Sequence, residues 1–234
     1  MARLKYYDGT EWKYADLALQ SSLPSGTNNG DILVWNGSAW ASKPKWQTSY
    51  QPVEYIQNSG TQWIYLTEQF TTDRLVVDFQ YITIPSGGEL IAADGTPSFN
   101  DGVLTAGGNG TVFRYFVGGT GDGGHSYGTI DTNRHTFDIG LEAQYFDNTL
   151  IGSYTATNKA AYHYLFSSNN TSPPILTPTK ARIYSAAWYY NNEKIVDLVP
   201  CYRISDGVIG VYDTVNHKFY TNAGTGTFTK GSDV

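Results

Sequence analysis

The chain has 234 residues and a mass of 25.8 kDa, and its 15 Lys and Arg against 21 Asp and Glu give a net charge of −6. An acidic chain without a basic cluster is a poor candidate for nucleic-acid binding, which depends on neutralising phosphates. No apolar run approaches the roughly 18 residues of a membrane span. The 25 Gly and 9 Pro are spread too evenly for a helical protein, while 15% aromatic residues are enough to fill a core.

Cysteine and histidine usage leaves no metal or disulfide framework. The single cysteine, Cys201, excludes an internal disulfide and a multi-cysteine metal site, and its expected state is a buried, inert thiol. The start of the chain has no apolar signal-peptide core. We therefore expect a soluble protein made in a reducing cytoplasm, with no cofactor and no metal. The four histidines share no metal-ligand spacing: His125, His135, His163 and His217.

Residues 1–46 differ from the rest of the chain. The phrases Tyr7–Trp12 and Trp35–Trp40 both read aromatic, Asp or Asn, Gly, hydroxyl, any residue, Trp. Asp-Gly and Asn-Gly favour tight hairpin turns, so each phrase predicts a β-hairpin with ring partners across its strands. A segment so poor in aliphatic residues has too little core of its own. We predict that it is an attachment and oligomerisation segment, acting through Trp12, Trp35 and Trp40.

From Val53 onward, short alternating segments follow one another between turn signals. Residues 74–81 alternate apolar and polar in the manner of a half-buried strand, and residues 181–190 return through Asn191-Asn192 as 194–199. About a dozen such segments with almost no helical period predict an antiparallel two-sheet sandwich or jelly roll over residues 50–234.

Three motifs of the C-terminal third resemble a module found in phage and prophage structural proteins of gut bacteria. They are Arg182–Ser185, Val196–Arg203 followed by Ser205–Asp213, and Phe219–Phe228; Val53–Ile64 resembles the opening of the same module. The resemblance covers about residues 50–230 and implies a laminin-G-like, concanavalin A-like jelly roll. The repeated phrase in residues 1–46 is similar to phrases in tail-fibre and head-fibre proteins.

The concanavalin-like fold also includes glycoside hydrolases, which need paired carboxylates. The nearest pair is Asp138 and Glu142, four positions apart with Gly140 midway between them. The Glu-x-Asp-x-x-Glu pattern of the laminarinase-like enzymes is absent, and no nucleophile elbow, Cys–His pairing or phosphate loop is present. We predict that the protein is not an enzyme and that it has no catalytic residues.

The glycine-rich stretch 118–128 is the most unusual part of the sequence. Glycines expose the backbone to close approach, so Asp122, His125 and Tyr127 could contact a sugar, together with Arg114 and Tyr115 of the preceding strand. Asp122 could instead join carbonyl oxygens around Ca²⁺, or the stretch could be a plain hairpin tip. Tyr189, Tyr190 and Trp188 are further rings for sugar stacking, although alternation turns about half of such rings into the core.

The sequence thus predicts a bacteriophage virion structural protein, a head or tail fibre or decoration protein, on the virion surface. Its jelly roll would adhere to host or mucosal glycans, and residues 1–46 would join it to other virion proteins as a homotrimer. No nucleic acid and no membrane insertion are expected. Two alternatives remain open: a capsid- or tail-stabilising assembly protein with no ligand, and a carbohydrate-active enzyme.

Overall fold

The computed structural model describes residues 3–7, 12–16, 31–35, 38–85, 89–94, 103–106, 111–116, 125–153, 160–167 and 179–234. Contacts divide the chain into two compact units, Met1–Thr48 and Ser49–Val234. In the part that is described, strands dominate, and the one helical element is a single 3-10 turn, η2 (Lys45–Thr48). No helix in these ranges is long and apolar enough to span a bilayer.

The first unit contains two separate hairpins, as the repeated phrase predicts. Strand β1 (Arg3–Tyr7) pairs with β2 (Trp12–Asp16), and β3 (Asp31–Trp35) pairs with β4 (Trp40–Pro44), each pair antiparallel. In both hairpins the two aromatic residues that bound the turn are register partners, Tyr7 opposite Trp12 and Trp35 opposite Trp40. Residues 8–11 and 36–37 of the turns lie outside the described residues.

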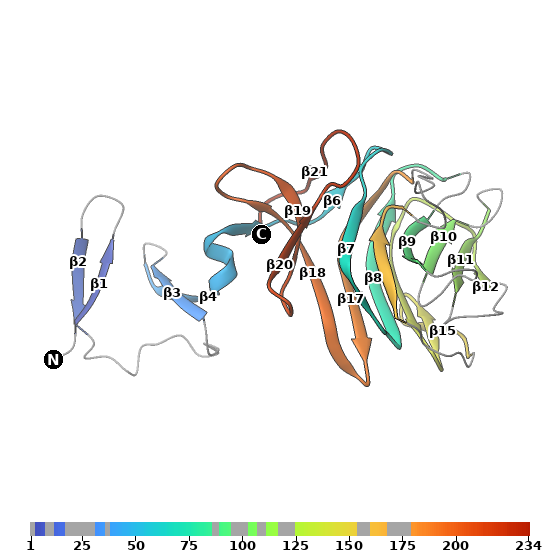
Figure 1. Cartoon of the computed structure of the whole chain (residues 1–234), viewed down its shortest axis with the longest axis horizontal. Coiled ribbons are helices and arrows are strands. Elements are labelled where there is room, and N and C mark those ends of the chain that lie inside the picture. Colours follow the sequence, from blue (N-terminus) through green and yellow to red (C-terminus); the bar gives the residue numbers. More distant parts are fainter. Residues whose placement is uncertain are drawn as a thin grey trace. The chain divides into compact units, whose positions relative to one another are not determined.

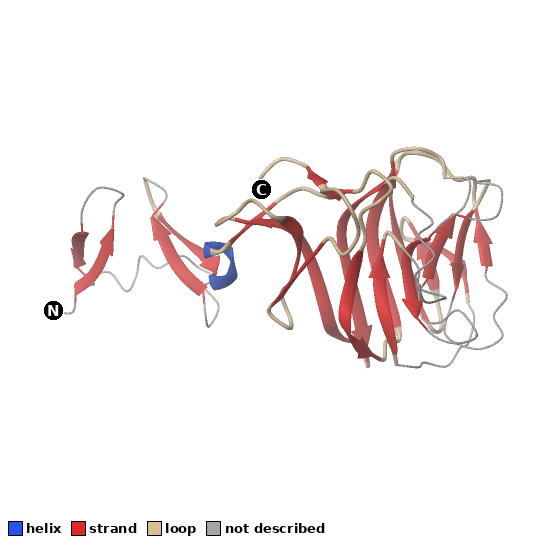
Figure 2. Ribbon diagram, turned by 45° about the horizontal axis from the view of Figure 1, so that its top comes forward, coloured by secondary structure: helices blue, strands red, loops and turns tan. Residues whose placement is uncertain are grey.

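The second unit consists of two antiparallel sheets (Figure 1). The smaller sheet has the order β12-β11-β10-β9-β16-β7, and its strands are β7 (Ile64–Phe70), β9 (Glu89–Asp94), β10 (Val103–Ala106), β11 (Phe113–Phe116), β12 (His125–Tyr127) and β16 (Ala161–Leu165). Figure 2 shows the unit as strands joined by loops.

The larger sheet has the order β15-β14-β13-β8-β17-β18-β19-β20, with β5, β6 and β21 paired at its margins. Its strands are β5 (Tyr50–Pro52), β6 (Ile56–Gln57), β8 (Arg74–Tyr81), β13 (Arg134–Gly140), β14 (Gln144–Phe146), β15 (Thr149–Gly152), β17 (Ala181–Tyr190), β18 (Glu193–Arg203), β19 (Ile209–Asp213), β20 (Lys218–Thr221) and β21 (Thr229–Lys230).

The core lies between the inner faces of the two sheets. Strand β8 alternates throughout, with Leu75, Val77, Phe79 and Tyr81 buried and the residues between them facing outward. One hydrophobic cluster joins these side chains to residues of the smaller sheet such as Ile91. The alternation follows from the pleat of a strand that has a core on only one side.

Strand β17 contains a bulge that matters for the outer face. Its register against β8 shifts between Ile183, which is opposite Phe79, and Ser185, which is opposite Asp78. The extra residue is Tyr184, and past the bulge Tyr189 lies opposite Arg74. A bulge adds one residue to the strand and shifts the alternation of its side chains by one position. Residues on opposite sides of the bulge therefore share a face when they are an odd number of positions apart.

These features confirm the predicted fold, an all-β antiparallel sandwich with a small N-terminal hairpin segment. The predicted strand at residues 74–81 is β8, and the last hairpin of the sheet is β19 and β20 around the turn that begins at Asp213. Asp213 is fully buried, and its carboxylate accepts hydrogen bonds from the backbone N–H groups of Asp197, Val215 and Asn216. A carboxylate that satisfies three backbone donors fixes this turn.

Candidate functional site

The predicted ligand-binding side chains that the structure describes do not share one surface. In the pairing of β11 with β12, Tyr115 lies opposite His125 and Arg114 opposite Ser126. Opposed residues share a face and neighbours along a strand alternate, so Arg114 lies on the other side of the sheet from Tyr115 and His125. Among the predicted residues that the structure describes on this hairpin, Arg114 therefore does not share a site with Tyr115 and His125.

Tyr115 is a core residue. Its side chain is 1% exposed, and its ring centre lies 5.2 Å from that of Phe137 and 5.4 Å from that of His125. A ring with so little exposed surface offers no face to a sugar, which corrects the prediction for Tyr115. Tyr127 is half-buried on the same side, 5.2 Å from the ring of Phe146, and packs at the edge of the core.

Four other predicted residues, Asp122, Trp12, Trp35 and Trp40, are described to different extents. Asp122 lies outside the described residues, and Trp12 opens β2 with a side chain that the structure does not describe. Trp35 and Trp40 are cross-strand neighbours whose ring centres lie 5.5 Å apart at 60°. Trp35 is exposed at the surface of its unit, so it is available for contact with another chain.

A cleft of about 500 Å³ lies on the outer face of the larger sheet, where β8, β13 and β17 meet the loops at their ends. It is lined by Asp73, Arg74, Asp138, Gly140, Leu141, Glu142, Ala143, Tyr145, Tyr189 and Asn192. Carboxylates, a guanidinium, an amide and two tyrosine rings therefore share one open hollow, the mixture that ligand sites use to combine orientation with contact area.

The centre of the cleft is an ion pair between Arg74 and Asp138. Arg74 Nε donates to Asp138 Oδ1 at 2.7 Å, and Arg74 Nη2 donates to Oδ2 at 2.6 Å. Gly140 lies directly opposite Arg74 and has no side chain, so the Arg74 side chain can extend past it to the Asp138 carboxylate. Hydrogen bonding to Asp138 raises the pKa of Arg74 above its ordinary value, and the pair holds a fixed fork geometry.

Two tyrosines border this pair. The guanidinium carbon of Arg74 lies 5.0 Å from the ring centre of Tyr189, within cation–π range. Tyr145, opposite Asp138 on β14, is 37% exposed. The neighbouring Tyr190 is exposed into a different hollow of about 340 Å³, which Leu66 and Tyr220 also line.

The same cleft contains Asp138 and Glu142, the nearest pair of carboxylates that the sequence offers for catalysis. Strand β13 ends at Gly140, so Glu142 lies in the turn that follows it. Asp138 and Glu142 therefore do not lie on one face of a single strand, although both line the cleft. Asp138 is engaged by Arg74, and Asp73 accepts a hydrogen bond from the backbone of Asn191.

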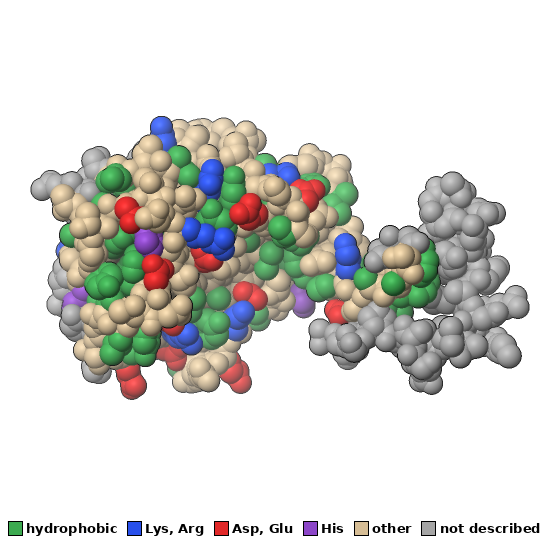
Figure 3. Space-filling model, turned by 180° about the vertical axis from the view of Figure 1, so that it is seen from behind, with side chains coloured by type: hydrophobic (Ala, Val, Ile, Leu, Met, Phe, Trp, Pro, Cys, Tyr) green, Lys and Arg blue, Asp and Glu red, His purple; other side chains and the backbone are tan. Residues whose placement is uncertain are grey.

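On the face of the sandwich seen in Figure 3, Lys and Arg side chains lie among Asp and Glu side chains and not in a patch of one sign. Within the described ranges, no three His, Cys, Asp or Glu side chains are arranged to hold a metal ion. Cys201 is fully buried, and this burial raises the pKa of its thiol to about 12, as expected for an inert cysteine.

Sequence reasoning missed Arg74 and Tyr145 and gave Asp138 a different role. The alternation of apolar and polar residues in 74–81 is the sequence feature that places Arg74 on the outer face. The register that brings Arg74 beside Asp138, 64 positions away, has no local signature in the sequence.

Comparisons with known proteins bear on the fold alone. Neither a protein-family model nor a curated protein matches this sequence. A proposed carbohydrate-binding protein from Bacteroides ovatus superposes with a TM-score of 0.50 at 9% identity, over 85% of this chain and 65% of that one. A sialidase from Trypanosoma rangeli in complex with sialic acid gives a TM-score of 0.40 at 11% identity, over 68% of this chain and 30% of that one. The chain thus spans less than two thirds of either structure, and the first likeness agrees with the β-sandwich fold.

Proposed function

We propose that this protein is a structural component of a bacteriophage particle whose jelly roll adheres to glycans on a host or mucosal surface. The observation that carries the glycan-binding part is the cleft of Arg74, Asp138, Tyr145 and Tyr189. The phage assignment is supported by the motifs at 182–185, 196–213 and 219–228, and the fibre-type assignment by the separate hairpin unit.

The cleft has the chemistry that a neutral sugar requires. A pyranose has an apolar face, for which the exposed ring of Tyr145 is a platform, and a rim of hydroxyl groups. Arg74 uses two of its five N–H donors on Asp138, which leaves donors for sugar oxygens, and the carboxylate keeps lone pairs for sugar hydroxyls. Three carboxylates against one guanidinium line the cleft, so an acidic sugar would be repelled.

The N-terminal unit supports display on a particle. Two short hairpins with paired tryptophan and tyrosine positions are too small to supply a core of their own. Residues 1–46 would join the sandwich to other virion proteins and to two further copies of the chain. The trimer is proposed by analogy with fibre proteins. Monovalent binding on the order of millimolar would then be raised by orders of magnitude through many copies on one particle.

The test of the binding proposal is a glycan array probed with the full chain and with two tyrosine variants. Tyr189→Ala removes the ring beneath Arg74, whereas Tyr190→Ala removes the neighbouring exposed ring that lines the other hollow. We expect binding to neutral glycans, weaker binding to their sialylated counterparts, and loss of signal only in Tyr189→Ala.

Other outcomes would overturn particular parts of the proposal. No binding to any glycan favours the assembly protein without a ligand, and hydrolysis of a bound glycan favours the carbohydrate-active enzyme, with Asp138 and Glu142 as its first carboxylates to substitute. The phage part is tested separately, by locating the protein in an intact particle by electron microscopy.

A further inference from the structure

The outer face of the larger sheet carries a second arrangement like the first. Arg134 of β13 donates through Nε to Asp78 Oδ1 at 2.8 Å and through Nη2 to Oδ2 at 2.7 Å. Its guanidinium carbon lies 3.7 Å from the ring centre of Tyr184 on β17. We call Arg74, Asp138 and Tyr189 the first triplet, and Arg134, Asp78 and Tyr184 the second triplet.

The two triplets use the same three strands with the partners exchanged. In the first, β8 supplies the arginine and β13 the aspartate; in the second, β13 supplies the arginine and β8 the aspartate. In each, the arginine reaches diagonally across the β8–β13 register, because Arg74 is opposite Gly140 and Arg134 is opposite Gln80. The bulge at Tyr184 places both tyrosines on this outer face although five positions separate them.

The length of this face follows from the strand geometry. Arg74 is six positions from Gln80, the residue opposite Arg134, so the two arginines stand about 20 Å apart along the strands. Asp138 and Asp78 lie between them, about 7 Å apart along the strands, because Asp138 is opposite Val76 and Asp78 is opposite Thr136. The two triplets therefore form one continuous row that is longer than a single sugar ring.

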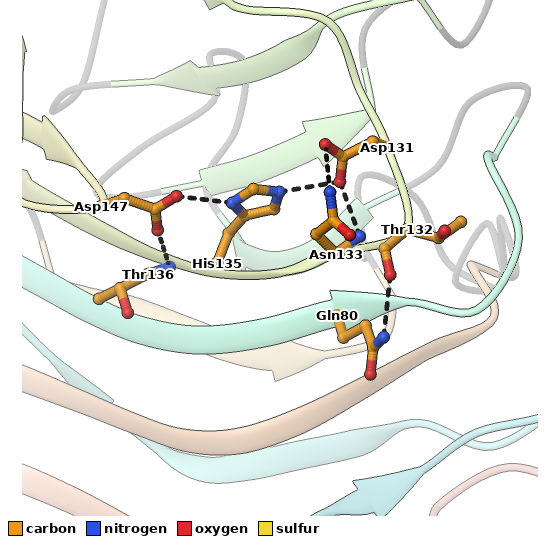
Figure 4. A network of polar contacts seen from close by, with 7 residues as sticks. All are labelled: Gln80, Asp131, Thr132, Asn133, His135, Thr136 and Asp147. Carbon is orange, nitrogen blue, oxygen red and sulfur yellow. Dashed lines mark hydrogen bonds and ion pairs between the residues drawn. The ribbon is translucent and has the colours of Figure 1, made fainter.

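A polar network adjoins the second triplet. Gln80 accepts a hydrogen bond from the Tyr184 hydroxyl at 2.9 Å. The side-chain amide of Gln80 also donates to the carbonyl oxygen of Thr132 at 2.9 Å (Figure 4). Beside it, His135 lies between two carboxylates, with Nδ1 2.7 Å from Asp147 and Nε2 2.9 Å from Asp131. These bonds fix the start of β13, from which the side chain of Arg134 extends.

Both pairs are open to a ligand. The side chains of Arg134 and Arg74 are 51% and 41% exposed, and each arginine spends two of its five donors on its aspartate. An exposed ion pair of this kind is neutral overall and offers donors beside acceptors. Adjacent hydroxyl groups of a neutral sugar, which both accept and donate, complement such a pair.

We infer that the second triplet is a second sugar subsite, and that the outer face binds a neutral oligosaccharide long enough to lie across both triplets. The inference rests on the proposed function, since it extends the same glycan-binding face. The chain would run along β8, β13 and β17, with hydroxyl groups of one unit on Arg74 and Asp138 and those of a later unit on Arg134 and Asp78.

The experiment uses an array of gluco-, galacto- and manno-oligosaccharides, each in two-residue and six-residue forms. The full-length protein is compared with Arg134→Ala and with the control Arg203→Ala. Arg203 forms the same type of pair with Asp206 and lies 5.5 Å from the ring of Phe219, at the far end of β18. A third variant, Arg134→Lys, keeps the charge without the fork.

We expect the six-residue form of a bound series to bind at least tenfold more tightly than the two-residue form. Arg134→Ala should abolish that preference while leaving two-residue binding unchanged, Arg134→Lys should lose most of it, and Arg203→Ala should keep it. Equal binding of short and long forms, or a preference that survives Arg134→Ala in a variant with unchanged melting temperature, would overturn the inference alone. Absence of binding to every array member would overturn the proposed function as well.

Discussion

Arg74 and Asp138 meet across two neighbouring strands in a two-pronged ion pair, with N–O distances of 2.7 and 2.6 Å. The pair stands on the outer face of the larger sheet, above the ring of Tyr189. As an exposed ion pair it adds only about 0–1 kcal/mol to stability, and under the proposed function its main role is in binding a glycan.

The first prediction separates these two contributions. Asp138→Asn removes the charge that orients Arg74 but keeps the shape of the side chain. We expect the free energy of unfolding to fall by less than about 1 kcal/mol in urea titrations, and the affinity for a neutral glycan to fall by on the order of tenfold. Asp206→Asn is the control, and an equal loss of affinity there would contradict the role of Asp138.

The second prediction concerns His163, which is fully buried in β16. Its ring stacks on Phe70 at 4.1 Å and meets the edge of Trp188 at 5.5 Å. Neither ring nitrogen has a hydrogen-bond partner among the described residues. Burial lowers the pKa of His163 to about 3, so the folded state keeps the ring neutral while the unfolded state takes up a proton below about pH 6.5.

Stability should therefore fall as the pH is lowered from about 6.5 towards 3, by at most about 1.4 kcal/mol per pH unit from this group. His163→Phe keeps an aromatic ring and removes the titration. The free energy of unfolding of the variant relative to the original protein should rise as the pH falls from 7 to 4. Parallel pH profiles in urea denaturation would show that His163 is not the cause.

The third prediction concerns the turn after β19. The buried carboxylate of Asp213 satisfies backbone donors and the Asn216 side chain, whose Nδ2 donates to Oδ2 at 2.7 Å. Asp213→Ala leaves these donors without their partner and should destabilise the protein by about 1–3 kcal/mol. Val215→Ala, in the same turn but exposed, should change stability by no more than about 0.5 kcal/mol. Similar melting temperatures for both variants would refute this role.

The fourth prediction concerns assembly. Deleting residues 1–46 should leave a sandwich with an unchanged melting temperature, since the second unit has its own core. The truncated chain should be monomeric in sedimentation, whereas the full chain should be trimeric. A truncated chain that remains oligomeric would move the assembly contact to the sandwich.

Local features of this protein were predictable from its sequence. The alternation of residues 74–81 matches β8, and the repeated aromatic phrases match the two hairpins, because period and turn chemistry act over a few residues. The same rule argues for the burial of Tyr115, which stands two positions from the core residue Phe113 on one strand. The glycine-rich stretch suggested a site there, but the alternation of β11 and β12 divides those side chains between two faces.

The cleft depends on relationships that alternation does not determine. Strands β8 and β13 are neighbours only because of the sheet order, and Tyr184 shares a face with Tyr189 only because of the bulge in β17. Both depend on how the whole sheet packs and pairs. A shift of one residue in the pairing register of either strand would move its side chains to the opposite face of the sheet. The outer-face site therefore emerges only when the sheet is assembled.

The most direct test of the proposed glycan-binding face is an NMR titration that observes the arginine side-chain Nε–H signals. The full-length protein is titrated with the six-residue gluco-, galacto- and manno-oligosaccharides. We predict that at least one of them shifts the signals of Arg74 and Arg134 while those of Arg114 and Arg203 stay in place. Shifts confined to Arg114 and the backbone of β11 and β12, or no shift with any of the three, would contradict the account.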